Sequence, residues 1–303
     1  MTVRESIERG SGPIFSFEIL PPLKGNDIRT VYNVIDKLRE FDPKYINITS
    51  HHSDPLKKRP GTVAIAAAIQ FRYGIAAVPH IICKGFTREE TEFALLDLNY
   101  LGIHNLLLLR GDMKSNAPLV RDASLCHEHA TDLQAQVNNF NRGIALDGSA
   151  LHGIETPFAY GMACYPEKHA EAPSLENDLH VARMKVDAGA QYLVTQMFFD
   201  NEKYYSFVRA CREAGITVPI IPGIKPVVKV DQLSVLPRVF ACDIPEPFAA
   251  ELRKCATDAE ATEVGAEWCI AQCRDLIAHG VPGLHFYTFL ASESVRRVAK
   301  EVF

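Results

Sequence analysis

The sequence lacks the features of a membrane or secreted protein. Its 303 residues contain no apolar run of about twenty residues, the length that a helix needs to span a bilayer. Segment 1–12 carries alternating charges where a secretory signal needs an apolar stretch. The eight cysteines include no Cys-x-x-Cys pair, unlike those of a small disulfide-rich protein. We therefore predict a cytoplasmic protein with free, mostly buried thiols and no membrane partner.

The sequence also lacks an excess of positive charge and a clear metal motif. Acids and bases are interspersed and the formal net charge is −5, so we exclude nucleic acid as a partner and expect small molecules instead. Cys269 and Cys273 lie four residues apart, whereas His51-His52 and His127-Glu128-His129 have other spacings. Buried thiols on one helix face and solvated histidines explain these groups more simply than metal ligands, so we predict no metal.

No repeat or low-complexity linker interrupts a regular alternation of strand-like and helix-like segments. Eight short apolar runs predict strands at 14–20, 45–50, 76–83, 105–112, 158–165, 192–199, 218–224 and 283–289. Helical periodicity between and after them predicts helices at 27–41, 61–73, 87–101, 122–138, 174–189, 201–214, 229–239, 257–279 and 291–302. Segment 138–156 reads as an inserted surface loop, and 240–256 predicts an extra helix before the eighth unit.

Eight βα units indicate a parallel sheet that is covered by helices on its outer face. An open doubly wound sheet would carry a Gly-x-Gly-x-x-Gly turn after its first strand, but Pro21-Pro22-Leu23-Lys24-Gly25 stands there instead. We therefore predict one α/β domain over residues 1–303, a (β/α)₈ TIM barrel.

The active site of such a barrel lies where its strands end. The polar residues expected there are Glu18, Thr49, Ser50, His51, His80, Arg110, Asp112, Tyr165, Gln196 and Tyr287. Any one of them taken singly is explained equally well as a solvated rim residue. Together they predict a single polar mouth.

Glu18 is the sharpest candidate, because it interrupts the apolar strand 14–20. A carboxyl among aromatic and aliphatic groups is disfavoured in its charged form, so we expect a raised pKa. A general acid that works near neutral pH needs such a shift. The alternative is an ion pair between Glu18 and a barrel cation.

Two further strand ends suit a ligand. Arg110-Gly111-Asp112 places a charge on each side of a glycine that permits close backbone approach, although an ion pair at the rim explains the charges equally well. Gln196 offers an amide beside Phe198 and Phe199, which suits a planar heterocycle, although the amide alternatively caps a loop and the two rings belong to the core.

Lys225, after the seventh strand, opens a different possibility. A desolvated lysine at a barrel strand end forms Schiff bases with carbonyl substrates. The residues thus leave an aldolase-type lyase as an alternative function.

Taken together, the strand-end motifs resemble those of the methylenetetrahydrofolate reductase family, in the same order and over nearly the whole chain. The matching motifs are Phe17-Glu18 with Pro21-Pro22, Pro79-His80, Leu109-Arg110-Gly111-Asp112, Tyr165-Pro166-Glu167-Lys168-His169-Ala170-Glu171-Ala172, Lys185-Val186-Asp187-Ala188-Gly189-Ala190, Thr195-Gln196-Met197-Phe198-Phe199-Asp200, Ile221-Pro222-Gly223-Ile224 and His285-Phe286-Tyr287-Thr288. Each is weak alone, but eight in register form a specific signal.

The resemblance implies a non-covalent FAD that is reduced by NADH or NADPH and then reduces 5,10-methylenetetrahydrofolate to 5-methyltetrahydrofolate in a ping-pong sequence. It implies that Glu18 protonates N10 of the folate and that Asp112 lies near N1 of the flavin. FAD contacts carried over by motif are Thr49, His80, Arg110, Gly111, Asp112, Tyr165, His169, Ala172, Asp178 and Lys185. Gln196 and Gln232 match folate contacts, and a homo-oligomer is implied.

The chain departs from the family pattern after Tyr287-Thr288, where Phe289-Leu290-Ala291 replaces the usual Leu-Asn-Arg. Lys225 stands at a position that is commonly apolar. We therefore expect Lys225 to supply the positive charge that binds the folate glutamate tail. The long C-terminal regulatory domain of eukaryotic members is missing, so we expect no inhibition by S-adenosylmethionine.

Overall fold

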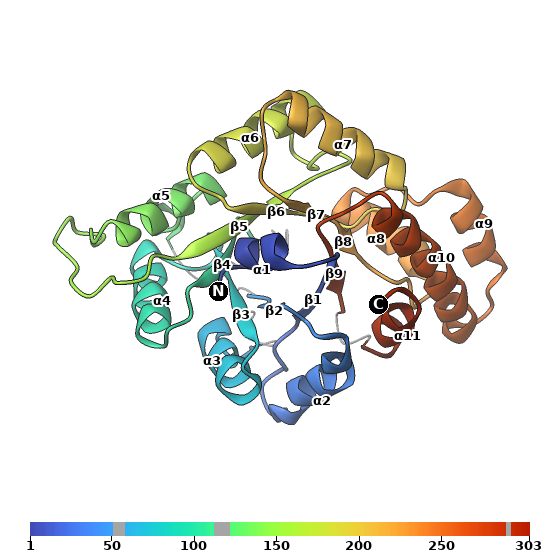
Figure 1. Ribbon diagram of the computed structural model, residues 1–303, viewed down its shortest axis with the longest axis horizontal. Helices are drawn as coiled ribbons and strands as arrows, with labels where there is room; N and C mark the ends of the chain where they lie inside the picture. The colour runs from blue at the N-terminus through green and yellow to red at the C-terminus, as the bar shows by residue number, and fades with distance from the viewer. Residues whose placement is uncertain (51–57, 112–121, 289–291) are drawn as a thin grey trace.

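A curved sheet of parallel strands forms the centre of the molecule (Figure 1). The computed structural model describes residues 1–50, 58–111, 122–288 and 292–303. The strands in these ranges are β1 (Ile14–Ile19), β2 (Tyr45–Ile48), β3 (Ala76–Ile82), β4 (Asn105–Leu109), β5 (Ala159–Cys164), β6 (Tyr192–Thr195), β7 (Ile220–Ile221), β8 (Gly223–Ile224) and β9 (Gly283–Tyr287). They lie in the order β7-β6-β5-β4-β3-β2-β1-β9-β8. The predicted TIM-barrel architecture is confirmed.

The barrel closes through a strand that Pro222 divides. The sequence predicts one strand over 218–224, but the structure has β7 before Pro222 and β8 after it. Proline has no N–H and cannot donate to the ladder, so the strand is interrupted there. β7 pairs with β6 and β8 pairs with β9. The two short halves thus join the last strand to the rest of the barrel.

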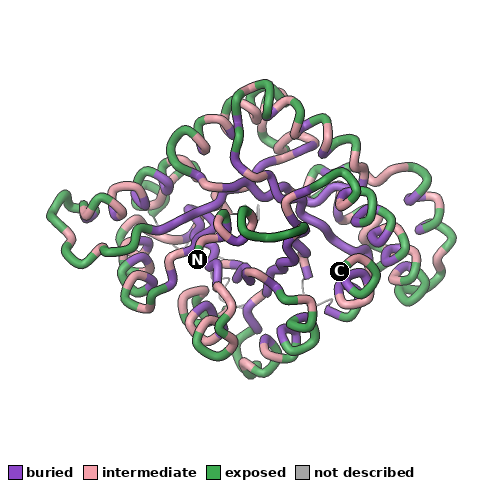
Figure 2. Tube along the Cα trace, viewed as in Figure 1, coloured by how far each residue is buried: buried purple, intermediate pink, exposed green. Residues whose placement is uncertain are grey.

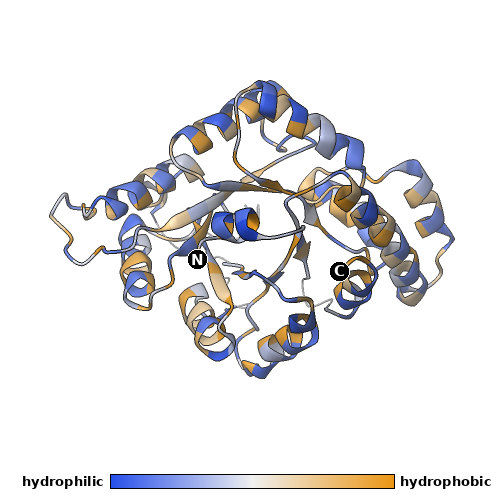
Figure 3. Cartoon of the chain, viewed as in Figure 1, coloured by the Kyte–Doolittle hydropathy of each residue, from blue (hydrophilic) through white to orange (hydrophobic). Residues whose placement is uncertain are grey.

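Helices cover the outside of the barrel, except for α1, which lies at one end (Figure 1). They are α1 (Val3–Arg9), α2 (Arg29–Leu38), α3 (Thr62–Tyr73), α4 (Arg88–Tyr100), α5 (Ala130–Asn141), α6 (Leu175–Asp187), α7 (Asn201–Glu213), α8 (Gln232–Phe240), α9 (Glu246–Lys254), α10 (Asp258–Ala278) and α11 (Ser292–Val302), with short 3₁₀ turns η1 (Arg39–Phe41) and η2 (Ala123–Leu125). Hydrophobic and hydrophilic residues lie on opposite faces of several of them (Figure 3). None of the helices in the described ranges is both long and apolar enough to cross a bilayer.

Three helical features refine the prediction. The extra helix expected within 240–256 is confirmed as α9. The helix expected over 122–138 is wrong at its start, because η2 comes first and α5 begins at Ala130. Asp132 accepts a hydrogen bond from the His129 backbone N–H in a capping box, which sets that beginning. The predicted insertion follows α5 and contains a short turn in which Ile144 pairs with Ala150.

Helix α1, which the sequence reading did not predict, closes the N-terminal end of the barrel (Figure 1). Asn105, the first residue of β4, accepts a hydrogen bond from the Val3 N–H at 3.1 Å and donates one to the Met1 carbonyl at 3.2 Å. Val3 and Ile7 pack against the side chains that fill the barrel. The opposite end, where the strands finish, is therefore where a ligand can enter.

The strands at the centre of the molecule consist largely of buried residues (Figure 2), and their side chains form an inner and an outer layer. Tyr45 of β2 and Tyr192 of β6 meet across the interior, with ring centroids 6.4 Å apart. Above them, His285 stacks on Tyr45 and lies 3.0 Å from the Ser16 hydroxyl. The outer layer, between strands and helices, holds most of the core and several of the eight cysteines, all of which are free thiols as predicted.

Candidate active site

The inner face of the strands carries the candidate residues to the mouth of the barrel. Ser16 pairs in register with Tyr45 and with His285, and Glu18 pairs with Tyr287. Side chains two residues apart on a strand share a face. Because Tyr45 and His285 fill the interior, Glu18 and Tyr287 also point into the barrel, one layer nearer the mouth.

Glu18 is almost fully buried, with 4% of its surface exposed. The backbone at Glu18 is held in place by Thr288, the residue after β9, because the Thr288 hydroxyl donates a hydrogen bond to the Glu18 carbonyl oxygen at 2.5 Å. The apolar residues Phe17 and Ile19 face the outer core on either side. A carboxyl in this position has little contact with water.

Tyr287 is locked beside Glu18. Its hydroxyl donates a hydrogen bond to the Thr195 carbonyl oxygen of β6 at 2.6 Å. Its ring lies over Gly223, where an added Cβ would come within 2.5 Å of the ring carbon Cε2. Burial raises the pKa of Tyr287 well above its ordinary value, and the nearby Glu18 adds to this shift. The phenol is therefore a neutral hydrogen-bonding group at neutral pH.

Lys225 follows β8 on the face that Gly223 also presents to the barrel. Only 5% of Lys225 is exposed, and burial lowers its pKa to about 8, against an opposing effect of the Glu18 charge. An ammonium group so deep in the barrel suits a contact with Glu18 better than a contact with a solvated substrate tail.

At the end of β4, Arg110 forms a two-pronged ion pair with Glu171 of the loop after β5. The two N–O distances are 2.6 and 2.8 Å. The rim ion pair left open by the sequence is therefore present. Glu171 is mostly exposed, so it holds the guanidinium loosely in place. Gly111 has a φ of 87°, a left-handed conformation that glycine adopts without strain, and it packs against the side chains of Ile82 and Lys84.

The loop after β5 brings together Tyr165 and His169, and Asp178 of α6 binds this loop. The Tyr165 and His169 rings meet edge to face with centroids 4.7 Å apart. The Asp178 carboxylate accepts a hydrogen bond from the His169 backbone N–H at 2.5 Å. Burial lowers the pKa of His169, and Arg110 lowers it further. Ala172 ends the same turn, where its carbonyl accepts a hydrogen bond from Lys168.

Lys185 of α6 is placed differently from the other predicted cofactor contacts. It is buried, and its ammonium donates a hydrogen bond to the Ala163 carbonyl oxygen of β5 at 2.7 Å. Burial lowers its pKa. The side chain fastens α6 to the barrel in this state and must turn to reach a phosphate.

The remaining described candidates also surround the mouth. Thr49, which follows β2, and His80, within β3, are both buried. Gln196 follows β6, and its side-chain oxygen accepts a hydrogen bond from the next backbone N–H at 2.9 Å. Gln232 begins α8 and accepts one from the Val228 N–H at 2.7 Å. Amide, hydroxyl and imidazole groups thus lie on or just after the strands that form the barrel, or at the start of α8.

A family model for methylenetetrahydrofolate reductase matches residues 2–302 of the chain. The chain belongs to this family. The 5,10-methylenetetrahydrofolate reductase of Salmonella typhimurium is 32% identical over 295 residues, which cover 96% of this chain and 91% of that protein. A probable methylenetetrahydrofolate reductase (NADPH) of Caenorhabditis elegans is 30% identical over 95% of this chain. The chain spans 42% of the nematode protein and 45% of a relative from Schizosaccharomyces pombe, less than half of each.

Solved structures share the fold of this member of the methylenetetrahydrofolate reductase family. One, described as an uncharacterized protein from Clostridium thermocellum that binds two copies of 5-methyl-5,6,7,8-tetrahydrofolic acid, matches with a TM-score of 0.59, 13% identity and 99% coverage of both chains. An oxaloacetate acetylhydrolase matches with a TM-score of 0.52 and 10% identity, covering 97% of this chain and 81% of the other. At such identities the likeness shows the fold alone.

Some family motif positions lie outside the described residues. These are Asp112 and the segment 289–291, and the strand-end candidate His51 also lies outside them. The predicted roles of Asp112 and of the departure after Thr288 therefore stay predictions.

Two residues at the site were not singled out from the sequence. Glu171 is part of the quoted motif, but nothing in its spacing reveals that it holds Arg110, because they are 61 residues apart. Thr195 precedes the predicted Gln196, and its carbonyl and hydroxyl anchor Tyr287 and the Gly223 N–H respectively. The one available signal for the contact between Thr195 and Tyr287 was the strand order of a barrel, which places β6 two positions from β9.

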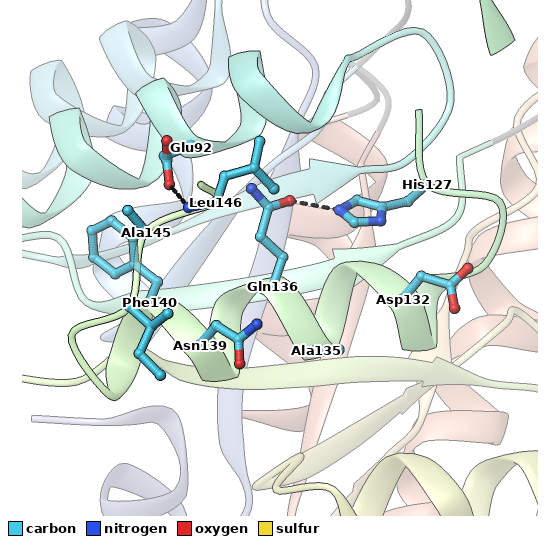
Figure 4. A pocket seen from close by; sticks show the side chains of 10 residues that line it. Glu92, His127, Asp132, Ala135, Gln136, Asn139, Phe140, Ala145 and Leu146 are labelled. Atoms are coloured by element: carbon cyan, nitrogen blue, oxygen red, sulfur yellow. Dashed lines mark hydrogen bonds between the residues drawn. The ribbon is translucent and has the colours of Figure 1, made fainter. Parts of the chain in front are cut away.

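A separate cavity of about 220 Å³ lies away from the mouth, between α4, α5 and the insertion (Figure 4). His127 and Gln136 meet over it at 2.5 Å, and Glu92 accepts a hydrogen bond from the Leu146 N–H. The bond between Leu146 and Glu92 fastens the insertion to α4.

Proposed function

We propose that this protein reduces 5,10-methylenetetrahydrofolate to 5-methyltetrahydrofolate, with NADH or NADPH as the reductant and a non-covalent FAD. The observation that carries the proposal is a carboxyl, Glu18, buried at the inner end of β1 in a chain that belongs to the methylenetetrahydrofolate reductase family. The relatives named above carry that activity in their names.

The rim around β4 and β5 fits a flavin dinucleotide. Arg110 presents a planar cation suited to a pyrophosphate. The Tyr165–His169 ring pair offers a surface for a heterocycle. Asp178 holds the backbone of that loop in place. We assign FAD contacts also to Thr49, His80, Ala172 and Lys185, with Asp112 near the flavin ring.

In this proposal the bound flavin supplies the hydride. Glu18 supplies the proton: its O–H breaks as N10 of the folate takes the proton, which opens the five-membered ring to an iminium. Because Glu18 is shielded from water, the proton is passed to the substrate and not to solvent. A positioned acid of this kind contributes about 10² to 10⁴-fold to the rate.

We assign substrate orientation to the amides of Gln196, which follows β6, and Gln232, which begins α8. Each amide oxygen now accepts a local backbone hydrogen bond, and each NH₂ group is a donor for the polar edge of a pterin. We further propose a homo-oligomer and a place in one-carbon metabolism, with methyl groups passed toward methionine. Relatives with names that specify NADPH and NADH both occur, so both dinucleotides are tested.

The experiment is to follow the two half-reactions separately in Glu18→Gln. The wild-type protein is expected to be yellow, to bleach with reduced nicotinamide, and to recover its absorbance with methylenetetrahydrofolate. Glu18→Gln is expected to bleach normally but to recover at least about 10²-fold more slowly. Glu8→Gln, on the exposed face of α1, is the matched control and recovers like the wild type.

Two results contradict parts of this proposal. If Glu18→Gln completes both half-reactions at wild-type rates, Glu18 is not the acid. If the wild-type protein binds no flavin and oxidises neither dinucleotide, the reductase assignment fails as a whole. The burial of Lys225 and its lowered pKa favour a Schiff-base lyase as the second candidate, which borohydride trapping of a carbonyl substrate on Lys225 would reveal.

A further inference from the structure

The mouth of the barrel contains a buried cation beside the proposed acid. Lys225 and Glu18 have exposed fractions of 5% and 4%. Burying an ionisable group costs free energy unless another group compensates for its lost hydration. Two buried ionisable groups of opposite charge in the barrel interior therefore require compensation, and each is a candidate to compensate the other.

The strand register places these groups on the two strands that flank β9. Glu18 of β1 pairs with Tyr287, and Ile224 of β8 pairs with Phe286. Lys225, the next residue after Ile224, therefore lies at the height of Tyr287. Lys225 and Glu18 lie on opposite sides of β9. The backbone is restrained on both sides, since the Thr288 hydroxyl binds the Glu18 carbonyl and Pro226 follows Lys225.

The charge of Glu18 acts on Lys225. Burial pulls the pKa of Lys225 down to about 8, and the charge of Glu18 is the largest influence in the other direction. The coupling is reciprocal, so the Lys225 ammonium favours the carboxylate form of Glu18. Cys269 of α10 also acts on Lys225, and Tyr287 of β9 stays neutral.

These facts conflict with a simple general acid. A Glu18 carboxylate beside an ammonium has no proton to give, yet the pair as a whole holds one. The same proton count describes a neutral lysine beside a protonated glutamate, a minor form in equilibrium with the ion pair.

We propose that Lys225 acts through Glu18, as a positioning residue that stores the proton Glu18 delivers to the folate. In the first step a Lys225 N–H bond breaks and a Glu18 O–H bond forms, which leaves a neutral amine. In the second, the Glu18 O–H breaks and the proton goes to N10. Water at the mouth later returns a proton to Lys225. The inference rests on the proposed function and adds to it the source of the proton.

The test is the pH profile of flavin reoxidation by methylenetetrahydrofolate in single turnover. In the wild type the rate is expected to stay level through neutral pH and to fall above about pH 8, where Lys225 loses its proton. In Lys225→Met the proton must reside on Glu18 alone, so the fall begins at lower pH. If the basic limb of the pH–rate profile moves down by one pH unit, the rate at pH values above both limbs falls about tenfold.

Lys225→Arg separates proton storage from charge. Arginine keeps the positive charge but does not release its proton, so Glu18 stays ionised. This variant is expected to be slow at both pH 6 and pH 8, whereas Lys225→Met is slow at pH 8 only. Lys229→Met, an exposed lysine of the same segment, is the control and keeps the wild-type profile. Flavin content and bleaching by reduced nicotinamide show that each variant is folded.

The opposite results overturn the inference. The inference is overturned by the wild type alone if its pH–rate profile has no basic limb near pH 8. Full activity of Lys225→Arg also overturns it, since this would mean that charge alone matters. If Lys225→Met raises the folate KM and leaves the limb in place, Lys225 binds the glutamate tail instead. A wild type that never reoxidises with methylenetetrahydrofolate refutes the proposed function itself.

Discussion

Replacing Gly223 by alanine tests how tightly β8 is packed against Tyr287. An added Cβ would lie 2.5 Å from Cε2 and 2.7 Å from the hydroxyl of Tyr287, and it would also meet the Thr195 carbonyl. Neither neighbour can yield, because the hydrogen bond of 2.6 Å from Tyr287 to Thr195 fixes both. Overpacking of this kind costs about 1–3 kcal/mol.

The expected change in melting temperature follows from the size of the chain. With about 2.1 cal/mol/K of unfolding entropy per residue, a chain of 303 residues loses about 2–5 °C for that cost. Thermal unfolding followed by circular dichroism measures it. Activity should fall as well, since Tyr287 is displaced beside Glu18.

The control is Gly12→Ala, because nothing lies within 4 Å of a Cβ built at Gly12. It should change the free energy of unfolding by less than about 0.5 kcal/mol. If Gly223→Ala melts with the wild type and keeps its turnover, the close contact of Gly223 with Tyr287 does not exist in solution.

Two further predictions concern pH. Burial lowers the pKa of His285 from 6.5 to about 3, so the unfolded chain gains a proton before the folded protein does. The free energy of unfolding therefore falls as the pH falls from 6.5 toward 3, by up to about 1.4 kcal/mol per pH unit. In urea unfolding, the midpoint of His285→Asn should depend less steeply on pH in this range, and an unchanged dependence would contradict this. Burial raises the pKa of Glu167 from 4.5 to about 7, so the stabilising contribution of this residue is lost as the pH rises through that range. Glu167→Gln should therefore raise Tm more at pH 8 than at pH 5. An equal gain in Tm at both pH values would count against this prediction.

The barrel could be predicted from the sequence because its signals are local. Apolar β-branched runs, helical periodicity and glycine helix ends each depend on a few neighbouring residues. The division at Pro222 was also readable in principle, since proline cannot continue a ladder. Helix α1 was missed because its seven residues are too few for a periodic signal, and its stability comes from Asn105 and the barrel interior.

The site was only partly predictable. The position of Glu18 at the end of β1 follows from strand alternation alone, and the structure agrees. That Lys225 lies beside it depends on how β8, β9 and β1 are placed next to one another, which is a property of barrel closure. The direction in which Lys185 points was also beyond the sequence, because a lysine on a helix can extend either toward the mouth or under the strand.

The pairing of β1 with β9 has a consequence for synthesis of the protein. Ser16 and its partner His285 are separated by 269 residues, so one edge of the strand that carries Glu18 is open until nearly the whole chain has been made. At about 5–20 residues per second, this exposure lasts about 10–50 s. An open parallel edge invites association with other chains. A shortage of nascent-chain chaperones should therefore reduce the yield of soluble protein before it affects the activity of each folded molecule.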